Sequence, residues 1–298
     1  MLKHNKEIVF PIGGIFAVIV TFNGDWKNVS RLVMQLTEDG IGHVVVDNGS
    51  SERADLVAFN TIFLNENLGI AAAQNVGIEH GLARGAAIVV FFDQDSVIDA
   101  GFISSLVRPI EDNRTKIAAP VFYDIKLGFS YPIVKLSKHG FRTKFRPEQM
   151  NGPVVTNVVI SSGTAVAADV FSVAGVMNAD LFIDYVDTEW CLRCFNKGFS
   201  ILINPAVRMD HSIGDRTISI GRFKAPIHSP LRRYYRIRNA LLLLRVPHVP
   251  KILAVREVLF SLAHQMLIIT VSKNRFSYLK YMVLGVVHGL TNRSGRLK

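Results

Sequence analysis

The sequence predicts an α/β protein with a mostly parallel sheet, helices on both faces of the sheet, and a helical extension at the C-terminus. Three observations support this prediction. Four short apolar runs alternate with helical patterns near the N-terminus, each run ends in small polar residues, and the final third is helical in pattern. Runs that are apolar at every position are typical of parallel strands buried on both faces.

The first two strand–helix units lie within the first fifty residues. Residues 15–20 form a β-rich apolar run, followed by a polar loop at 21–24 and a helical pattern at 28–36. Residues 44–46 form the second run. The segment Asp47-Asn48-Gly49-Ser50-Ser51 follows, and its short polar side chains favour a turn and a helix cap.

Two further units follow the same plan. Residues 61–64 predict a third strand that runs into the polar loop 65–69, and the Ala-rich segment 70–82 has good helix propensity. Residues 88–92 predict a fourth strand, which ends at Asp93-Gln94-Asp95-Ser96. Ligands of such sheets bind beyond the carboxyl ends of the strands, so we expect the four polar loops to line one cleft.

The middle of the chain is less regular. Residues 118–157 are rich in turns and proline and predict a variable loop region, whereas 158–162 resemble a strand and 168–173 a short helix. Residues 184–196 predict a helix that carries its acids in the first turn, where they favour the helix dipole. From Leu231 onward the pattern is helical.

The charge is divided unevenly along the chain. The net charge is +10, but residues 222–298 hold 15 Lys or Arg and one acid, which gives +14. Residues 1–221 hold 19 basic and 23 acidic side chains, or −4. We therefore expect a catalytic domain at 1–230 and a basic amphipathic extension at 231–298 that faces an anionic partner.

An anionic membrane surface is the partner that the extension favours. Its most apolar stretch, 258–272, is interrupted by His264 and Gln265 and is shorter than the roughly 20 residues that span a bilayer. We expect helices that lie on the membrane surface. The alternatives are a helix pair packed on the main domain or a homo-oligomer contact.

Several other classes of protein are disfavoured. Cys191 and Cys194 form one C-x-x-C pair, which cannot supply the four ligands of a structural zinc site and suits one face of a helix. The first strand lacks the G-x-G-x-x-G turn of a dehydrogenase, and the basic tail lacks a nucleic-acid-binding motif. Residues 1–10 lack the apolar core of a signal peptide, so we expect a cytoplasmic location.

Asp93 and Asp95 predict a metal site. Two carboxylates separated by one residue at the end of a buried strand repel each other unless a cation compensates for their charge. Mg²⁺ and Mn²⁺ bind few protein oxygens and prefer phosphate oxygens as further ligands, so such a site suits a diphosphate. Taken alone, the motif is also compatible with an ordinary acidic turn.

The combined motifs resemble the family 2 glycosyltransferases of GT-A fold. They are Val20-Thr21-Phe22-Asn23, Val46-Asp47-Asn48-Gly49-Ser50, the segment from Asn67-Leu68-Gly69 to Gln74-Asn75-Val76-Gly77, and Phe92-Asp93-Gln94-Asp95-Ser96. The resemblance covers roughly residues 12–240. Asp-Gln-Asp-Ser together with Gly-Ile-Ala-x-Ala-Gln-Asn resembles the bacterial rhamnosyltransferase branch more narrowly.

The resemblance implies a division of roles among these residues. The donor nucleotide-sugar would be bound by Thr21, Phe22, Asn23, Asp47, Asn67, Gly69, Asn75, Asp93 and Gln94. Asp95, Asp93 and His211 would bind the metal, with Asp95 the better ligand and Asp93 shared with the ribose. Ser162, Gly163, Asp184 and Trp190 would contact the acceptor.

Asp187 falls on the catalytic base of the family. Family members commonly have Glu-Asp at this point, whereas this chain has Val186 before Asp187, so only the Asp is matched. Asp184 is the alternative base. The acids could also do no more than stabilise the start of their helix, and a catalytically inactive membrane scaffold of the same fold remains an alternative.

The activity implied by the resemblance is an inverting transfer of L-rhamnose from dTDP-L-rhamnose, or of another sugar from a pyrimidine nucleotide. The acceptor would be a hydroxyl of a lipid-linked saccharide or glycolipid in cell-surface polysaccharide synthesis. Mg²⁺ or Mn²⁺ would be the cofactor, and the enzyme would lie on the inner face of the cell membrane.

Overall fold

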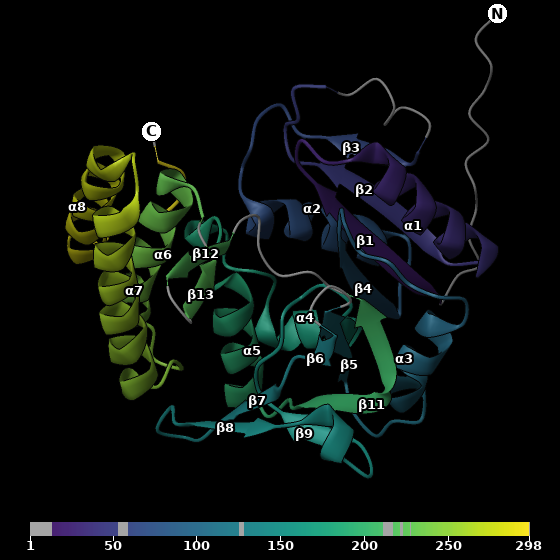
Figure 1. The fold of residues 1–298 in the computed structure, drawn as a ribbon. Helices are drawn as coiled ribbons and strands as arrows, with labels where there is room; N and C mark the ends of the chain where they lie inside the picture. Colours follow the sequence, from purple (N-terminus) through teal and green to yellow (C-terminus); the bar gives the residue numbers. More distant parts are fainter. Residues whose placement is uncertain are drawn as a thin grey trace, which may run out of the picture.

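A computed structural model describes residues 14–52, 59–124, 128–210, 217–220, 223–226 and 228–297, and it shows the predicted α/β architecture around a nine-stranded sheet (Figure 1). The strands of this sheet are β1 (Ile15–Thr21), β2 (Gly42–Asp47), β3 (Thr61–Phe63), β4 (Ile88–Asp93), β5 (Ile117–Asp124), β6 (Phe129–Ser130), β9 (Val154–Thr156), β10 (Ala165–Ala167) and β11 (Ile201–Asp210). Their order is β3-β2-β1-β4-β10-β5-β11-β9, with β6 paired to β5. β1, β2, β3, β4, β5 and β11 run in one direction. β6, β9 and β10 run in the opposite direction.

The four predicted N-terminal strands are confirmed, and they are parallel. β1, β2 and β4 are buried along nearly their whole length because both of their faces are covered. At the carboxyl edge, Thr21 pairs with Asp47, and Val20 pairs with Asp93. The register therefore brings the polar loops after β1, β2 and β4 to one edge, as the sequence predicts.

Helices connect these strands. They are α1 (Trp26–Glu38), α2 (Ile70–Ala83) and α3 (Phe102–Glu111), followed later by α4 (Ala168–Ala174) and α5 (Val186–Asn196). α2 packs very closely on β1, since a Cβ atom on Gly77 would lie 2.1 Å from Cγ1 of Val18, and one on Gly81 would lie 2.8 Å from the Phe16 ring. This close packing requires glycine at both positions.

The expectation of a variable loop region at 118–157 is wrong at its start. β5 lies between β10 and β11, and its first five residues are buried. Pro120 makes this segment look irregular, but it lies opposite a register shift in β11 between Ile203 and Arg208. The missing proline N–H is tolerated at such an irregularity. The rest of the region holds the hairpin of β7 (Ile133–Leu136) and β8 (Arg142–Phe145), a 3₁₀ turn at Pro147–Gln149, and β9.

The predicted strand at 158–162 is also wrong. This segment has no regular structure and lies between β9 and β10, which are the actual strands. The predicted helix at 168–173 is confirmed as α4. The predicted helix at 184–196 is confirmed as α5, which begins at Val186 because Asp184 and Tyr185 have positive φ.

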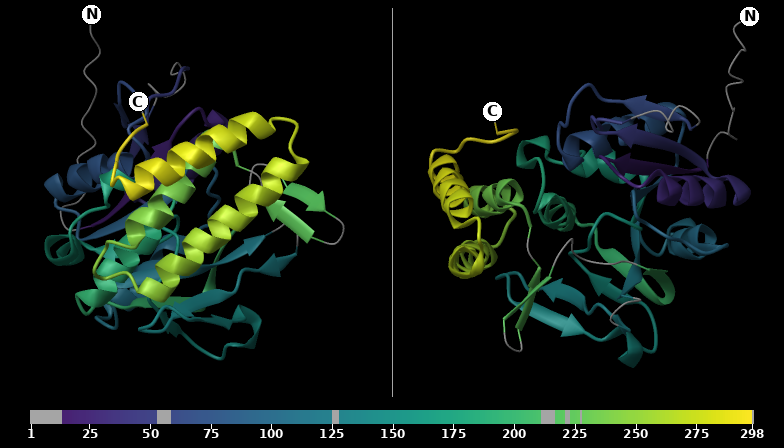
Figure 2. Two further views of the ribbon diagram at one scale, coloured as in Figure 1. Left: turned by 90° about the vertical axis from the view of Figure 1, so that its left-hand side faces the viewer. Right: turned by 45° about the horizontal axis from the view of Figure 1, so that its top comes forward.

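Three helices form the C-terminal region: α6 (Pro230–Leu243), α7 (Lys251–Val271) and α8 (Arg275–Leu290). Figure 2 shows α6 between the sheet domain and the pair formed by α7 and α8. A small hairpin of β12 (Thr217–Ile220) and β13 (Phe223–Pro226) precedes α6. Most of α6 is buried, so it belongs to the packed interior of the protein.

α7 is longer than the sequence indicated. It has 21 residues, and by length and composition it could cross a membrane, although 33% of its most apolar window is buried inside the protein. Gln265 does not interrupt it, because its side chain faces inward: Oε1 accepts a 2.7 Å hydrogen bond from Arg233 Nε, and Nε2 donates to the Tyr278 carbonyl.

Candidate functional site

The loops after β1 and β2 are fastened to each other through Asp47. This residue is fully buried, and its carboxylate accepts hydrogen bonds from the backbone N–H and the hydroxyl of Ser50. The Ser50 hydroxyl oxygen in turn accepts a 2.8 Å hydrogen bond from the Asn23 N–H, and Asn23 Oδ1 accepts from the Ser51 N–H. Asp47 therefore shapes this turn, which is the structural role expected of a short acid there.

Thr21 and Phe22 also lie at this edge. The Thr21 side chain is 1% exposed, and its Oγ1 has no hydrogen-bond partner within the described part of the chain. Phe22 is exposed, and its N–H donates a 2.8 Å hydrogen bond to Gln94 Oε1. Gln94, predicted to bind the donor, thus links the loop after β4 to the loop after β1.

The loop before α2 holds Asn67 and Gly69. Asn67 Oδ1 accepts from the Gly69 N–H at 2.9 Å and from Asn48 Nδ2 at 3.2 Å. Gly69 has φ of 91°, and a Cβ there would lie 2.5 Å from the Phe182 carbonyl oxygen. Only glycine suits this position, which brings α2 against the segment that leads to α5.

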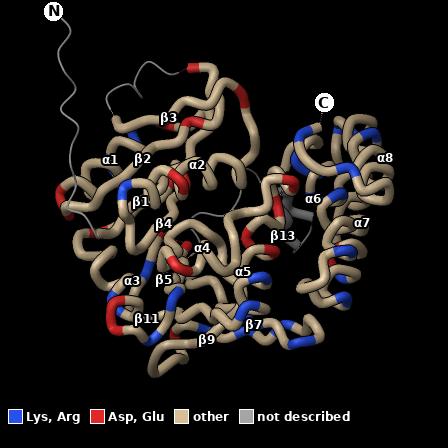
Figure 3. The backbone as a smooth tube through the Cα atoms, turned by 180° about the vertical axis from the view of Figure 1, so that it is seen from behind, with Lys and Arg blue, Asp and Glu red and all other residues tan. Residues whose placement is uncertain are grey.

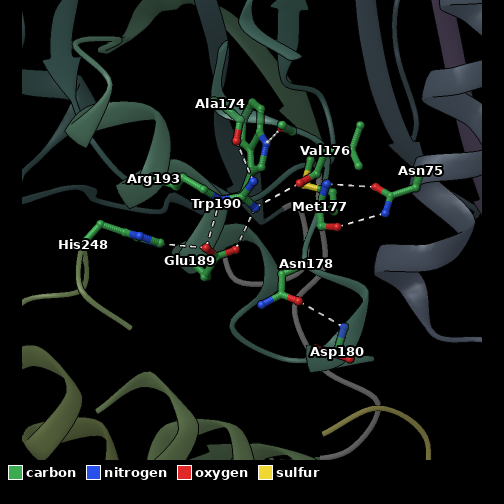
Figure 4. Close-up of polar contacts among 11 residues, drawn as sticks. Asn75, Ala174, Val176, Met177, Asn178, Asp180, Glu189, Trp190, Arg193 and His248 are labelled. Carbon is green, nitrogen blue, oxygen red and sulfur yellow. Dashed lines mark hydrogen bonds and ion pairs between the residues drawn. The ribbon is translucent and has the colours of Figure 1, made fainter. Parts of the chain in front are cut away.

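Asn75 joins α2 to the loop before α5. Its side-chain amide exchanges two hydrogen bonds with the backbone of Met177, at 2.8 and 2.9 Å (Figure 4). Both polar groups of the side chain therefore help to hold α2 to this loop. Its predicted contact with the donor stays a prediction.

Asp93 and Asp95 differ in their surroundings. Asp93 is partly buried at the end of β4, whereas Asp95 is exposed. The Asp93 N–H donates to the hydroxyls of Ser96 and Ser162, at 3.1 and 3.2 Å, and these two hydroxyls lie 2.9 Å apart. The serines therefore fix the backbone that carries the two carboxylates.

Two residues predicted to contact the acceptor, Ser162 and Gly163, also have contacts within the protein. Ser162 is buried, and its hydroxyl oxygen accepts the hydrogen bond from the Asp93 N–H. Gly163 is buried with φ of 73°, and its N–H donates to the Phe91 carbonyl at 2.6 Å. Both residues therefore join the loop before β10 to β4.

The donor set of Asp93 and Asp95 suits a divalent cation. Two carboxylates at one strand end provide hard oxygen ligands, and Mg²⁺ or Mn²⁺ would complete its coordination with diphosphate oxygens and water. No group of three His, Cys, Asp or Glu side chains that could hold a metal occurs among the residues that the structure describes. His211, the predicted third ligand, lies outside the described residues.

Asp187 lies in the first turn of α5 and interacts electrostatically with Asp93. Burial is the largest cause that raises its pKa to about 7, hydrogen bonding from Ser161 opposes the rise, and the charges of Asp93 and Asp184 add to it. Asp93 of β4 and Asp187 of α5 are therefore close enough for their charges to interact. A carboxylate whose pKa lies near neutrality is well suited to accept a proton.

Asp184, the alternative base, is held by α6. Its side chain is 7% exposed, and its oxygens lie 3.4 Å from Arg232 Nε and 3.6 Å from Arg236 Nη1. These two ion pairs join Asp184 to α6. The choice between Asp187 and Asp184 as the base stays a prediction.

Trp190 is a core residue, and its predicted contact with the acceptor stays a prediction. Its indole is 2% exposed, and Nε1 donates a 2.9 Å hydrogen bond to the Gly175 carbonyl. Cys191 and Cys194 are free and buried on the same helix, as a structural role predicts. Burial raises the pKa of Cys194 to about 12, so its thiol stays protonated.

The sequence did not identify several supporting residues of the site. Glu189 is buried between Arg193, which pairs with it through Nε and Nη2, and His248, whose Nε2 lies 2.7 Å from Glu189 Oε1 (Figure 4). Arg238 and Asn239 donate to the carbonyls of Asp180 and Leu181 and to neighbouring carbonyls. These residues hold the segment that positions α5, and only the structure shows which backbone groups they meet.

Comparison with known proteins agrees with this geometry. The sequence profile described as "Glycosyl transferase family 2" matches residues 16–171, a segment that contains Asp47, Asp93 and Asp95. The chain belongs to glycosyl transferase family 2. A protein named dTDP-rhamnosyl transferase RfbF from Shigella flexneri is 46% identical over 286 residues, which cover 94% of this chain and 97% of that protein. This glycosyltransferase is also 22% identical, over 76% of its length, to an uncharacterized protein, Rv1525, of Mycobacterium tuberculosis.

Solved structures show that the fold is shared more widely. The glycosyltransferase superposes on S. aureus TarS 1-349 in complex with UDP-GlcNAc with a TM-score of 0.57 and 12% identity, covering 93% of this chain and 81% of that one. It also superposes on GalNAc-T7 with UDP, GalNAc and Mn²⁺, with a TM-score of 0.56 and 17% identity, covering 78% of this chain and 49% of that chain. These likenesses concern the GT-A fold.

Proposed function

We propose that this glycosyltransferase transfers L-rhamnose from dTDP-L-rhamnose, with inversion and with the help of a divalent cation, to a hydroxyl of a lipid-linked saccharide or glycolipid. The observation that carries the proposal is the placement of Asp187 on α5 opposite Asp93 at the carboxyl edge of β4. The name of the Shigella relative supports the choice of rhamnose. In this proposal the base would lie next to the donor side of the site.

The nucleotide would bind at the loops after β1 and β2. Asp47 lies at the carboxyl end of β2, where its carboxylate could accept a hydrogen bond from the imide N–H of thymine, which purines lack. The buried Thr21 hydroxyl at the neighbouring strand end offers a further donor or acceptor. This edge would therefore select a pyrimidine nucleotide.

The diphosphate would lie at the loop after β4. A divalent cation held by Asp95 and Asp93 would offset negative charge on the departing diphosphate. The serine hydroxyls beneath Asp93 keep its backbone in place, so the two carboxylates keep their spacing while the donor binds.

Asp187 would act on the acceptor. Its carboxylate takes the proton of the acceptor hydroxyl while that oxygen forms a bond to the anomeric carbon of the sugar. The bond between the anomeric carbon and the diphosphate oxygen breaks, and the nucleoside diphosphate leaves with the bonding electron pair. One direct displacement inverts the configuration at the anomeric carbon.

Donor binding with and without chelator tests this proposal. The protein is incubated with a panel of nucleotide-sugars that includes dTDP-L-rhamnose, in Mn²⁺ or Mg²⁺, and the Kd and the slow hydrolysis of each donor are measured. We expect dTDP-L-rhamnose to bind best, and we expect EDTA or Asp95→Ala to weaken its binding at least tenfold. Binding that is indifferent to both changes would rule out the metal role.

We also propose that the protein lies on the cytoplasmic side of an anionic membrane and contacts it through the outer face of α7 and α8. Exposed apolar side chains gather there, including Leu259, Phe260, Met266, Phe276 and Leu290, and a groove on α7 combines apolar residues with Lys251 and Arg256. Lys251 and Arg256 of α7 and Arg275 and Lys280 of α8 lie along these helices, which carry one acid, Glu257 (Figure 3). Apolar side chains among basic ones are typical of helices that lie on anionic lipid.

Vesicle flotation tests the location. We expect the protein to float with vesicles that contain anionic lipid and to stay in solution with neutral ones. Leu259→Ser/Phe260→Ser should abolish flotation, whereas the matched change Met34→Ser, at an exposed apolar residue of α1, should not. If the double variant floats normally but loses a dimer seen by light scattering, the face is an oligomer contact and the membrane proposal fails.

A further inference from the structure

Gln74 and Ser161 lie behind the proposed base and have no assigned role. Gln74 belongs to α2 and is 2% exposed, while Ser161 belongs to the loop before β10. Gln74 Nε2 donates a 2.8 Å hydrogen bond to Ser161 Oγ. Ser161 and Asp187 line the same small cavity, so the glutamine, the serine and the carboxylate follow one another in space.

The direction of the hydrogen bonds follows from the chemistry of the three groups. An ionised carboxylate only accepts hydrogen bonds, so the Ser161 hydroxyl must donate when it meets Asp187. The lone pairs of Ser161 Oγ are then left to accept from the Gln74 amide, as the structure shows. The hydroxyl hydrogen is then available to Asp187 on α5, which lines the same cavity.

We propose that Gln74 and Ser161 are positioning residues that hold one oxygen of the Asp187 carboxylate and thereby present the other oxygen to the acceptor hydroxyl. This inference rests on the proposed role of Asp187 as the base. The acceptor proton must be taken within hydrogen-bond distance, and a free carboxylate could rotate away from it.

The surroundings of Asp187 explain why its carboxylate would need a hydrogen-bond donor beside it. The cavity wall beside it is mostly apolar and includes Phe91, Val159 and Trp190. Burial and the charges of Asp93 and Asp184 raise the pKa of Asp187. Hydrogen bonding from the hydroxyl and the backbone N–H of Ser161 lowers this pKa and so opposes both effects. Removing the hydroxyl leaves the backbone N–H as the remaining contact from this loop.

Steady-state kinetics with the whole chain test whether Gln74 and Ser161 position Asp187. Ser161→Ala should lower kcat for sugar transfer by about 10- to 100-fold, the scale of a misplaced reacting group, and leave the donor KM nearly unchanged. Ser161→Thr keeps the hydroxyl and should restore most of kcat. Gln74→Met should lower kcat to a similar degree, and the double variant should be no worse than either single variant because both remove one chain of contacts.

Thr164→Val is the matched control. Thr164 lines the same cavity, but its hydroxyl donates to the Ile160 carbonyl, so its loss should change stability without the selective loss of kcat. An unchanged kcat in Ser161→Ala, or equal losses of kcat in Ser161→Ala and Thr164→Val, would overturn the proposed positioning role. Asp187→Asn separates this result from failure of the proposed function: if Asp187→Asn still transfers sugar, the base itself is wrong.

Discussion

At the residue scale, the site depends on how differently its acids are held. Asp184 is ion-paired with two arginines, Asp47 is hydrogen-bonded to Ser50, and Asp187 lies in a mostly apolar wall with Ser161 beside it. From the sequence, Asp47 is predicted to bind the donor, Asp187 to be the base, and Asp184 to be the alternative base. Their roles separate only when their partners are known, and those partners lie on other elements, far away in sequence.

The raised pKa of Asp187 predicts a stability cost at neutral pH. Its pKa moves from 3.8 to about 7, mainly because burial disfavours the charged form. The folded state therefore favours the protonated acid; this stabilisation is complete below pH 3.8 and is lost as the pH rises through about 7. Asp187→Asn should raise Tm at pH 8 by about 2–6 °C and have less effect near pH 4.

Thermal unfolding of the two proteins at both pH values checks this expectation. Asp25→Asn is a suitable control, because Asp25 is an exposed helix cap whose carboxylate accepts from the Lys27 N–H. A Tm gain for Asp187→Asn that is the same at both pH values would argue against the raised pKa.

At the scale of elements, the N-terminal strands and helices were predictable because periodicity and turn residues agree there. The middle of the sheet was not. Pro120 argued against a strand at β5, because the register shift in β11 that accommodates this proline lies more than 80 residues further along the chain. The extent of α7 was missed for a related reason, since Gln265 was taken for an interruption while it binds Arg233 inside the protein.

The packing of α2 on β1 gives a prediction at this scale. A Cβ on Gly77 would overlap the Val18 side chain, so Gly77→Ala should destabilise the protein by about 1–3 kcal/mol, the usual cost of overpacking. Gly152→Ala, where a Cβ would meet no atom within 4 Å, is the control and should be nearly neutral. Urea unfolding of both variants measures the difference, and equal midpoints would contradict the tight contact.

At the scale of the whole molecule, α6 joins the C-terminal helices to the catalytic domain. Arg238 is fully buried and donates to the carbonyls of Asp180, Leu181 and Gly295, so it ties α6 to both the segment before α5 and the chain end. The sequence predicts that this stretch belongs to a basic amphipathic extension that faces an anionic partner. The structure shows instead that Arg238 is an internal connector.

Loss of this connector should affect stability and activity together. Arg238→Met removes the hydrogen bonds that the guanidinium donates to Asn239 Oδ1 and to the carbonyls of Asp180, Leu181 and Gly295, and it should destabilise the protein by about 3–5 kcal/mol. The same change at Arg114, which makes a 3.7 Å surface ion pair with Asp112, should cost less than about 1 kcal/mol. Chemical denaturation of the two variants checks this contrast, and similar losses would show that the buried contacts add little.

The central claim is that Asp187 takes the acceptor proton in a site whose donor side is built by Asp93 and its neighbours. The most direct test compares donor affinity and sugar transfer in Asp187→Asn. The account predicts that the Kd for dTDP-L-rhamnose stays within about twofold of the unmodified protein while transfer falls by about 10²- to 10⁴-fold. Transfer that persists at the original rate with the donor bound normally would contradict it.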